Sequence, residues 1–283
     1  AALVLGRARR HVMLFDRNEP RNAPTRASHG FLTRDGIAPG EFRKIAHEEL
    51  ARYPNVQVRM QTVIDVRKDG AAFRVATEDG MVVWARKIIL ATGLKDRLPE
   101  VPGIREFYGK SLFSCPYCDG WERRDEPLIV ISENEHGPDF ARTVYAWSRN
   151  LILATNGHYV VSRMHRQKLA AKGIRVYEQK IRALIGREGM LEQVVFEDGT
   201  TERRTGGFVA ATWSHPSPFG QMLGCEFNAH GGIAADDFGR TSVRSVYAAG
   251  DAANIVPAQL VVAAASGCRA AIGVNSELID EED

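Results

Sequence analysis

The spacing of hydrophobic residues predicts helices and strands from the first residue onward. Residues 1–10 (AALVLGRARR) have the pattern of an apolar helix, and the apolar segment that follows predicts a buried strand ending in Asp16. Residues 17–40 show neither the helical nor the strand spacing of apolar residues. They are rich in Pro, Gly, Asn and Arg, so they predict a long loop. A loop of this length inside a compact domain is usually functional or disordered. Residues 41–51 return to a helical pattern.

A run of short strands is predicted next. Residues 56–93 alternate between apolar and polar positions, with the turn sequences KDG and EDG between the alternating segments. Turns of this kind between period-two segments are typical of a small antiparallel meander. The last segment, IILATG (88–93), is continuously apolar and ends in small residues, which is expected where the backbone passes close to a ligand.

A second α/β unit begins near residue 108. Its expected strands are 127–132, 150–157, 174–180 and 207–212, its helices are 137–149 and 162–173, and a hairpin covers 191–204. The chain then returns to a strand that ends in a Gly-Asp turn (241–251) and to a long helix of small residues (257–279). This order predicts an α/β fold with two Rossmann-like domains, the first made of residues 1–106 and 231–283 and the second inserted as residues 107–230.

Composition narrows the class of protein. Hydrophobic residues make up 44% of the 283 residues and charged residues 25%, which fits a soluble globular protein with a sizeable core. There is no apolar run of about 18 residues, so no membrane-spanning helix is predicted. The net charge of +2 is too small to indicate a nucleic-acid or membrane partner. Four cysteines in a chain of this length do not make a disulfide scaffold, and we expect a reducing compartment, the cytoplasm.

The segment SCPYCDGWE (114–122) carries the candidate chemistry. Its two cysteines could bind a metal, close a structural bridge or pass electrons. A zinc site usually needs four ligands, but Cys225 and Cys268 are isolated and no histidine pair has ligand spacing, so no metal site is predicted. The redox interpretation is favoured, because two intervening residues let the thiols oxidise to each other and the adjacent acid can move the proton that exchange requires. Cys225 and Cys268 are expected to be core residues.

Asp16 is the second candidate for a functional residue. A helix that leads into a strand ending in an acid is typical of the back half of a dinucleotide-binding βαβ unit, where the acid accepts hydrogen bonds from a ribose. The acid stands roughly 20 residues after the glycine-rich turn. We therefore expect a first strand and a phosphate loop upstream of Ala1. The alternative is an ordinary helix–strand pair with a surface aspartate.

Four segments in order resemble the low-molecular-weight thioredoxin reductase family. They are IILATG (88–93), CPYCDG (115–120), VYAAGDAAN (246–254) and PAQLVVAAASGCRAA (257–271). The family includes gliotoxin-type dithiol oxidases and flavin thioredoxin reductases that do not use NADPH. The resemblance implies an FAD domain in two chain segments around an inserted NADPH-like domain, and a homodimer.

The resemblance also implies residue roles. Cys118 faces the flavin, Cys115 exchanges with the substrate, and Asp119 is the general acid/base. Asp119 is also a candidate N-cap of the segment that follows. The FAD-binding residues implied by position are Asp16, Ala91, Thr92, Gly93, Gly250, Asp251, Gln259 and Leu260, with Asn22 and His29 as candidates for the flavin face.

The second domain departs from the family at the nucleotide site. Where the family has a glycine-rich turn, this chain reads ISENEHGPDFA, which leaves only Gly137 and adds Glu133 and Glu135. The segment after the next strand lacks an arginine pair for a 2′-phosphate, and Trp213 and His215 stand where a small-residue turn is expected. These departures predict loss of ordinary NADPH binding. The alternative is a divergent loop that binds NADPH through arginines.

The sequence thus favours an FAD-dependent dithiol–disulfide oxidoreductase. Its partner is a thioredoxin-like protein or a small-molecule dithiol, and its other electron partner is ferredoxin or oxygen. The alternatives are an NADPH-dependent thioredoxin-disulfide reductase and a non-catalytic FAD-binding scaffold, against which the CxxCD motif argues. Trp121 and Glu122 could shape a small-molecule pocket, but Trp121 is equally well explained as an interface or core residue.

Overall fold

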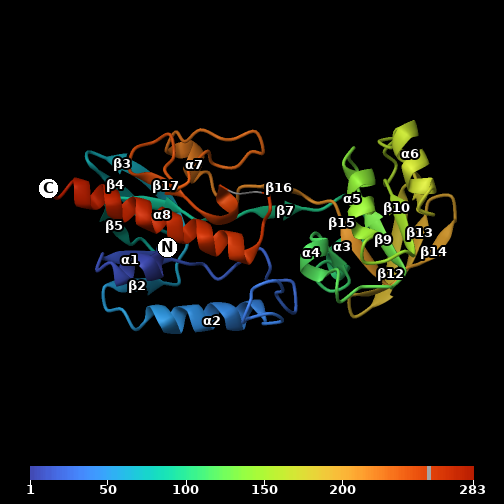
Figure 1. Cartoon of the computed structure of the whole chain (residues 1–283), viewed down its shortest axis with the longest axis horizontal. Coiled ribbons are helices and arrows are strands. Elements are labelled where there is room, and N and C mark those ends of the chain that lie inside the picture. The colour runs from blue at the N-terminus through green and yellow to red at the C-terminus, as the bar shows by residue number, and fades with distance from the viewer. Residues whose placement is uncertain (254–255) are drawn as a thin grey trace. The chain divides into compact units, whose positions relative to one another are not determined.

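The computed structural model describes residues 1–253 and 256–283, which form two compact units (Figure 1). Unit 1 contains Ala1–Ala23, Gly30–Lys95 and Ser214–Asp283, and unit 2 contains Pro24–His29 and Asp96–Trp213. The chain passes between the units through β7 (Lys95–Arg97) and β16 (Thr212–Ser214), which pair with each other.

These limits differ from the expected boundaries at 106/107 and 230/231. Val101, Ile104 and Phe107 pack into the core of unit 2, which draws the segment before residue 107 into that unit. Phe219 and Cys225 pack into a core of unit 1, which draws the segment after β16 into unit 1. The boundaries between the units are therefore set by contacts between side chains that are distant along the chain. The spacing of apolar residues in the sequence does not show these contacts.

The described residues of unit 1 form small sheets and four α-helices. Its strands are β1 (Val12–Phe15), β2 (Val56–Arg59), β3 (Val63–Asp69), β4 (Ala72–Thr77), β5 (Val82–Ala85), β6 (Ile88–Leu90) and β17 (Val246–Ala248). Its helices are α1 (Ala2–Arg7), α2 (Pro39–Leu50), α7 (Phe219–Met222) and α8 (Leu260–Asp280), with a 3-10 turn η1 (Gly250–Ala252). β1 pairs with β2 and β6 with β17 in parallel, whereas β3, β4 and β5 form the predicted antiparallel meander.

Unit 2 is a five-stranded parallel sheet in the order β11-β10-β9-β15-β8. These strands are β8 (Leu112–Phe113), β9 (Leu128–Ile131), β10 (Leu151–Ala154), β11 (Arg175–Tyr177) and β15 (Gly206–Val209). The helices are α3 (Ile104–Phe107), α4 (Pro116–Asp119), α5 (Gly137–Val144) and α6 (Arg163–Ala170). A separate antiparallel sheet contains β12 (Ile181–Arg187), β13 (Met190–Phe196) and β14 (Thr201–Arg203).

The sequence of strand β9 is continuously apolar because its residues are buried on both faces of the sheet. Its four residues are fully buried, but they face alternate sides of the sheet. Leu128 and Val130 pack in the cluster with α5 and α6, whereas Ile129 and Ile131 pack in the cluster with β12 and β13. A parallel sheet covered on both faces requires this composition. The structure confirms the predicted α/β class.

Two further expectations about local structure hold. The predicted loop of residues 17–40 contains no helix or strand before α2 begins at Pro39. The predicted long C-terminal helix is α8. Within residues 1–253 and 256–283, no helix combines the length and apolarity needed to cross a bilayer.

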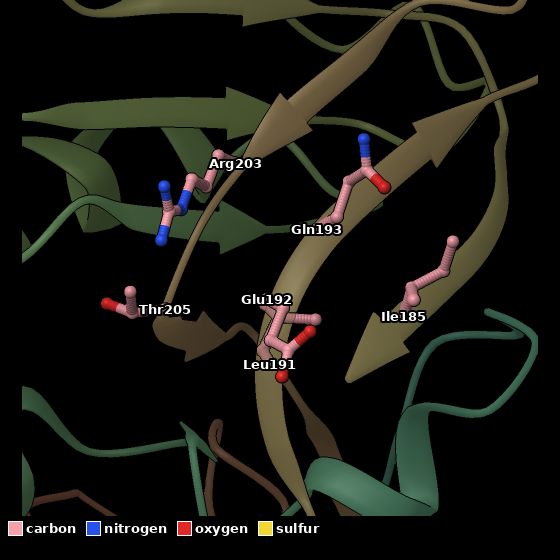
Figure 2. A pocket seen from close by; sticks show the side chains of 6 residues that line it. All are labelled: Ile185, Leu191, Glu192, Gln193, Arg203 and Thr205. Carbon is pink, nitrogen blue, oxygen red and sulfur yellow. The ribbon is translucent and has the colours of Figure 1, made fainter. Parts of the chain in front are cut away.

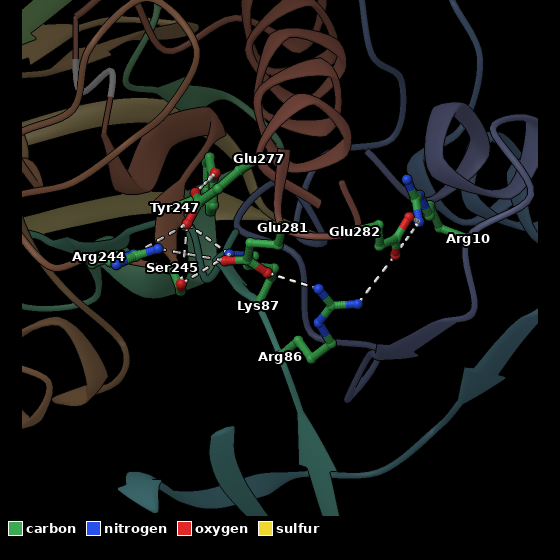
Figure 3. A network of polar contacts seen from close by, with 9 residues as sticks. All are labelled: Arg10, Arg86, Lys87, Arg244, Ser245, Tyr247, Glu277, Glu281 and Glu282. Carbon is green, nitrogen blue, oxygen red and sulfur yellow. Dashed lines mark hydrogen bonds and ion pairs between the residues drawn. The ribbon is translucent and has the colours of Figure 1, made fainter. Parts of the chain in front are cut away.

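A network of ion pairs fixes the end of α8 to the strands of unit 1 (Figure 3). Lys87, which precedes β6, lies 2.6 Å from Glu277 and 2.5 Å from Glu281, and its side chain is only 5% exposed. Tyr247 of β17 also donates to Glu277. Arg244 lies at the edge of the network, 3.9 Å from Glu277, and is 82% exposed.

We expect Lys87→Met to destabilise unit 1 by about 2 kcal/mol, because it removes the buried cation that Glu277 and Glu281 share and leaves them only the more exposed Arg86 and Arg244. Arg244→Met removes a charge from the same network but from an exposed position, and it should cost less than about 0.5 kcal/mol. Urea unfolding of both variants measures the difference. Equal effects of the two substitutions would show that burial of Lys87 does not matter.

Candidate active site

The cysteine motif forms a single helical turn. Cys115 has extended backbone and precedes α4, Pro116 occupies the first helical position, where its missing N–H is not needed, and Cys118 follows within the turn. Cys115 and Cys118 form a disulfide, with their Cα atoms 5.3 Å apart. The structure therefore brings together the two thiols that the sequence predicted to be a redox pair.

The turn is held in place by an aromatic contact. A side chain at Gly120 would lie within 2.8 Å of the Trp147 ring, so a glycine is required after the motif for the two segments to pack. Tyr117, between the cysteines, meets the edge of the same ring with centroids 5.3 Å apart. Trp147 thus fixes the orientation of α4 and, with it, the disulfide.

Asp119 is the last residue of α4 and is partly buried. Burial raises the pKa of Asp119 to about 7, the positive charge of His29 lowers it, and the negative charge of Glu122 raises it further. A carboxyl group that titrates near neutral pH can both accept and release a proton, as thiol–disulfide exchange requires. Asp119 is a helical residue of this turn and does not cap the segment that follows.

His29 is brought to this site by the tertiary structure. The sequence made Asn22 and His29, which share one loop, candidates for the flavin face, but Asn22 belongs to unit 1 and His29 to unit 2. The His29 Nε2 atom lies 3.7 Å from Glu122 Oε1, close to the cysteine motif. The only signal in the sequence was the position of His29 in a long polar loop.

The turn that follows β9 is closed by its own side chains. The backbone N–H of His136 donates to the Asn134 side-chain oxygen at 3.0 Å, and the N–H of Gly137 donates to the Asn134 carbonyl at 3.1 Å. In a nucleotide-binding domain, the N–H groups at the start of this helix bind the pyrophosphate. Here two of them, those of His136 and Gly137, are already bonded to Asn134 within the turn.

Glu133 links this turn to the turn after β10. Its carboxylate accepts a hydrogen bond from Asn156 Nδ2 at 2.6 Å and lies 4.0 Å from His158 Nε2. Asn156 is buried, and its own oxygen accepts from the N–H of Ile181 at 3.0 Å. A fixed carboxylate therefore lies at the carboxyl ends of two adjacent parallel strands, where such domains bind nucleotides. These residues do not fit a pyridine nucleotide.

The residues expected to bind FAD lie in unit 1 at the carboxyl ends of its parallel strands. Asp16 follows β1, Ala91–Gly93 follow β6, and Gly250 and Asp251 follow β17. Gly93 has a left-handed backbone (φ 68°), and a side chain there would meet no atom within 4 Å. Open space beside backbone N–H groups suits a nucleotide cofactor, so these residues fit the adenine-nucleotide part of FAD.

Asp16 is held by α2. Its carboxylate accepts hydrogen bonds from Arg43 and from the N–H of Asn18, and lies 3.4 Å from His47. Partial burial works to raise the pKa of Asp16, but the hydrogen bonds from Arg43 and Asn18 and the charges of Arg43 and His47 together outweigh it, so the pKa lies below its ordinary value. Asp16 is therefore an ionised acceptor, as recognition of a ribose requires.

The start of α8 supplies a second group of expected cofactor residues. Gln259 precedes the helix, Leu260 is its first residue, and no side chain caps the first turn. The uncapped N–H groups of this long helix favour an electron-rich group. Asp251 lies 3.5 Å from Arg21, which neutralises part of its charge. Asn254, the last residue of the VYAAGDAAN segment, lies outside the described residues.

The remaining candidates take structural positions. Trp121 is 66% exposed with the Arg124 guanidinium over its ring, and His215 contacts the Gly231 carbonyl at 2.7 Å. Cys225 is buried in a core of unit 1, as predicted, whereas Cys268 on α8 is only partly buried.

Figure 2 shows a hollow of about 320 Å³ on unit 2, beside β12, β13 and β14. The residues that line it are Ile185, Leu191, Glu192, Gln193, Arg203 and Thr205. They include no residue of the cysteine motif and no expected cofactor residue, so this hollow has no part in the chemistry described above.

The chain resembles proteins named as thioredoxin reductases. It is 31% identical to a probable thioredoxin reductase from Arthroderma benhamiae, covering 98% of this chain and 76% of that protein. It is 30% identical to thioredoxin reductase aclD from Aspergillus oryzae, over 100% of this chain and 93% of that protein. The crystal structure of the putative thioredoxin reductase TrxB from Bacillus anthracis shares 45% identity and superposes with a TM-score of 0.96, covering 100% of this chain and 95% of that chain.

The model of the pyridine nucleotide-disulphide oxidoreductase family matches residues 1–267. This range includes both units, the disulfide turn and the loops at the carboxyl ends of β1, β6 and β17. The chain belongs to the pyridine nucleotide-disulphide oxidoreductase family.

Proposed function

We propose that this protein is a thioredoxin reductase-like, FAD-dependent oxidoreductase that exchanges electrons with a dithiol or disulfide substrate and does not use NADPH as its ordinary reductant. The observation that carries the proposal is the Cys115–Cys118 disulfide with the partly buried acid Asp119 directly after it. FAD, when bound, accepts or supplies an electron pair. Asp16, Gly93, Asp251 and the start of α8 would hold it.

The exchange step uses the cysteine turn. A substrate thiol gives its proton to Asp119 and its sulfur attacks Cys115, which breaks the Cys115–Cys118 bond and releases Cys118 as a thiolate. The second substrate thiolate then attacks the substrate sulfur that is bonded to Cys115. The substrate leaves as a disulfide, oxidised by two electrons, and the protein pair is reduced. The reverse sequence reduces a disulfide substrate.

The closed turn after β9 supports the NADPH-independent part of the proposal. Glu133 and Asn134 occupy the positions from which a pyrophosphate is bound, and Glu133 is anchored by Asn156. The proposed substrate is a thioredoxin-like protein or a small-molecule dithiol, and oxygen or ferredoxin is the other electron partner. On family resemblance alone, we also propose a homodimer in the cytoplasm. Conventional NADPH-dependent reduction of thioredoxin is the second candidate, and the names of the relatives support it.

NADPH should be a poor reductant of the FAD-loaded protein. Because the N–H groups of His136 and Gly137 are already bonded to Asn134 and the turn contains a fixed carboxylate, we expect a dissociation constant about two to four decades weaker than that of an intact site. Anaerobic titration with NADPH, followed by flavin absorbance, measures this. Dithiothreitol is the matched positive control and should bleach the flavin. Stoichiometric bleaching at micromolar NADPH would favour the second candidate.

The two cysteines should differ in reactivity. In Cys118→Ser, the free Cys115 should form a stable mixed disulfide with Ellman's reagent, at least about ten-fold faster than Cys118 does in Cys115→Ser. Conversely, only Cys115→Ser should show the long-wavelength absorption of a thiolate beside FAD. Mass spectrometry and absorbance record these results. If the two variants behaved identically, the different roles assigned to Cys115 and Cys118 would be wrong.

Asp119→Asn should change the pH dependence of both activity and stability. If Asp119 is the base, the ratio of wild-type to Asp119→Asn dithiol oxidation should rise with pH through about 7, towards a factor of about 100 or more. The folded carboxyl holds its proton up to about pH 7 and the unfolded one only to its ordinary pKa of 3.8, so wild-type stability should fall between these values. Asp119→Asn should lack this fall and be more stable at pH 8. A pH-independent activity ratio would exclude the base role.

A further inference from the structure

Residues 140–177 are basic and contain no compensating acid. This segment runs from α5 through β10 and α6 to β11, and it has seven lysines and arginines but no aspartate or glutamate. Over the whole chain the charges nearly balance, with 37 Lys and Arg against 35 Asp and Glu. The excess of cations is therefore a local feature of this segment and does not follow from the overall composition.

Four of the seven cations face solvent without an acidic partner. The other three form ion pairs with acids that lie outside the segment. The four are exposed, and none of them forms an ion pair with a residue that the structure describes: Arg149, Arg163, Lys168 and Lys172. They belong to α5 and α6 or to the residues that follow these helices, which pack together on one face of the parallel sheet. We refer to these four cations as the basic surface.

Two cations of the basic surface are held on one aromatic ring. The Arg149 guanidinium lies 4.5 Å and the Lys172 ammonium 4.7 Å from the centroid of the Tyr145 ring. The contacts with the ring favour these positions for both charges, but they also bring like charges close together. An anionic group that binds between the two cations would relieve their repulsion.

Helix stability does not account for the whole basic surface. Cations near a helix C-terminus are favourable, which explains Lys168 in the last turn of α6 and Lys172 just after it. Arg163, however, is the first residue of α6, where the helix dipole disfavours a cation, and the first turn contains no acid. Binding of an acidic partner explains this position, and helix stability does not.

The basic surface borders the redox turn. Trp147, whose ring contacts Tyr117 and closes the space beside Gly120, lies two residues before Arg149. The segment that follows the turn runs beside it, because the N–H of Asp125 donates to the Trp147 carbonyl at 2.9 Å. A protein interface of standard size buries about 800 Å² on each partner, which is enough to include both the basic surface and the turn.

We propose that the basic surface docks an acidic protein whose own dithiol or disulfide exchanges with Cys115. This rests on the proposed function and selects the protein partner over the small-molecule dithiol. The opposite charges speed the encounter and orient the partner, so that its reactive sulfur reaches the turn. When the partner's dithiol is oxidised to a disulfide, the Cys115–Cys118 pair takes up its two electrons and two protons, and the reverse exchange returns them.

The test measures how fast Cys115 attacks a protein disulfide. In Cys118→Ser, Cys115 forms a mixed disulfide with an acidic thioredoxin that carries thionitrobenzoate on its reactive cysteine, and the released thionitrobenzoate gives the second-order rate constant. In that background, Arg149→Glu/Lys172→Glu should lower the rate constant at least about ten-fold, because both charges that attract the partner are reversed. Dithiodipyridine is uncharged and needs no docking surface, so its rate constant should change by less than about two-fold.

Arg182→Glu/Arg187→Glu is the matched control. Both arginines are exposed on β12, which packs on the opposite face of the sheet, and the substitutions change the net charge by the same amount. The rate constant with thioredoxin should fall by less than about two-fold. Raising the salt from about 0.1 M to 1 M shortens the screening length from about 10 Å to 3 Å, so the effect of Arg149→Glu/Lys172→Glu should shrink.

Equal losses in the two double variants would overturn the proposal, because net charge alone would then explain them. An unchanged rate constant with thioredoxin in Arg149→Glu/Lys172→Glu would overturn it too, and a loss of duplex DNA binding in the same variant would then assign the surface to nucleic acid. Failure of the proposed function is a separate result. The FAD-loaded wild type would then show no dithiol turnover, whereas formation of the mixed disulfide requires neither FAD nor turnover.

Discussion

One helical turn, Pro116–Asp119, is the constraint on which the chemistry of this protein depends. It holds the Cα atoms of the two cysteines 5.3 Å apart, within the range that a disulfide requires, and places an acid immediately after the second sulfur. A four-residue helix has little stability of its own. The packing of Gly120 and Tyr117 on Trp147 supplies the rigidity, so the redox pair is oriented by an aromatic side chain from another part of unit 2.

Burial of Asp119 in this turn lowers the stability of the folded protein at neutral pH, and the same burial gives the carboxyl the pKa that the chemistry requires. Withdrawing the Asp119 carboxyl from water disfavours its charged form, which makes the folded protein less stable as the pH rises towards 7. An exposed aspartate would avoid this cost but would remain ionised at neutral pH and could not return a proton. His29 and Glu122 act on the same carboxyl with opposite charges, so its titration depends on three segments of the chain.

The turns at the carboxyl ends of the parallel strands differ between the two units. In unit 1, Gly93 leaves open space after β6, and the first turn of α8 has no side-chain cap. In unit 2, Asn134 accepts hydrogen bonds from the N–H groups of His136 and Gly137 in the corresponding turn, and Glu133 is anchored on Asn156. One nucleotide-type site is therefore open, and the other is closed by hydrogen bonds of the kind that a nucleotide would otherwise make.

Local patterns in the sequence determined much of the fold and part of the site. Apolar runs and turn residues predicted the α/β class, the meander and the long helix α8, because a residue's period along the chain decides which face it buries. The spacing of Cys115 and Cys118 predicted the redox pair, and the missing glycines before Gly137 predicted a changed nucleotide turn, since both depend on consecutive residues. Only the tertiary structure decided the unit boundaries, the Glu133–Asn156 bond and the place of His29. Each of these joins segments that are distant along the chain. Local spacing in a single sequence does not indicate which distant side chains will be buried together.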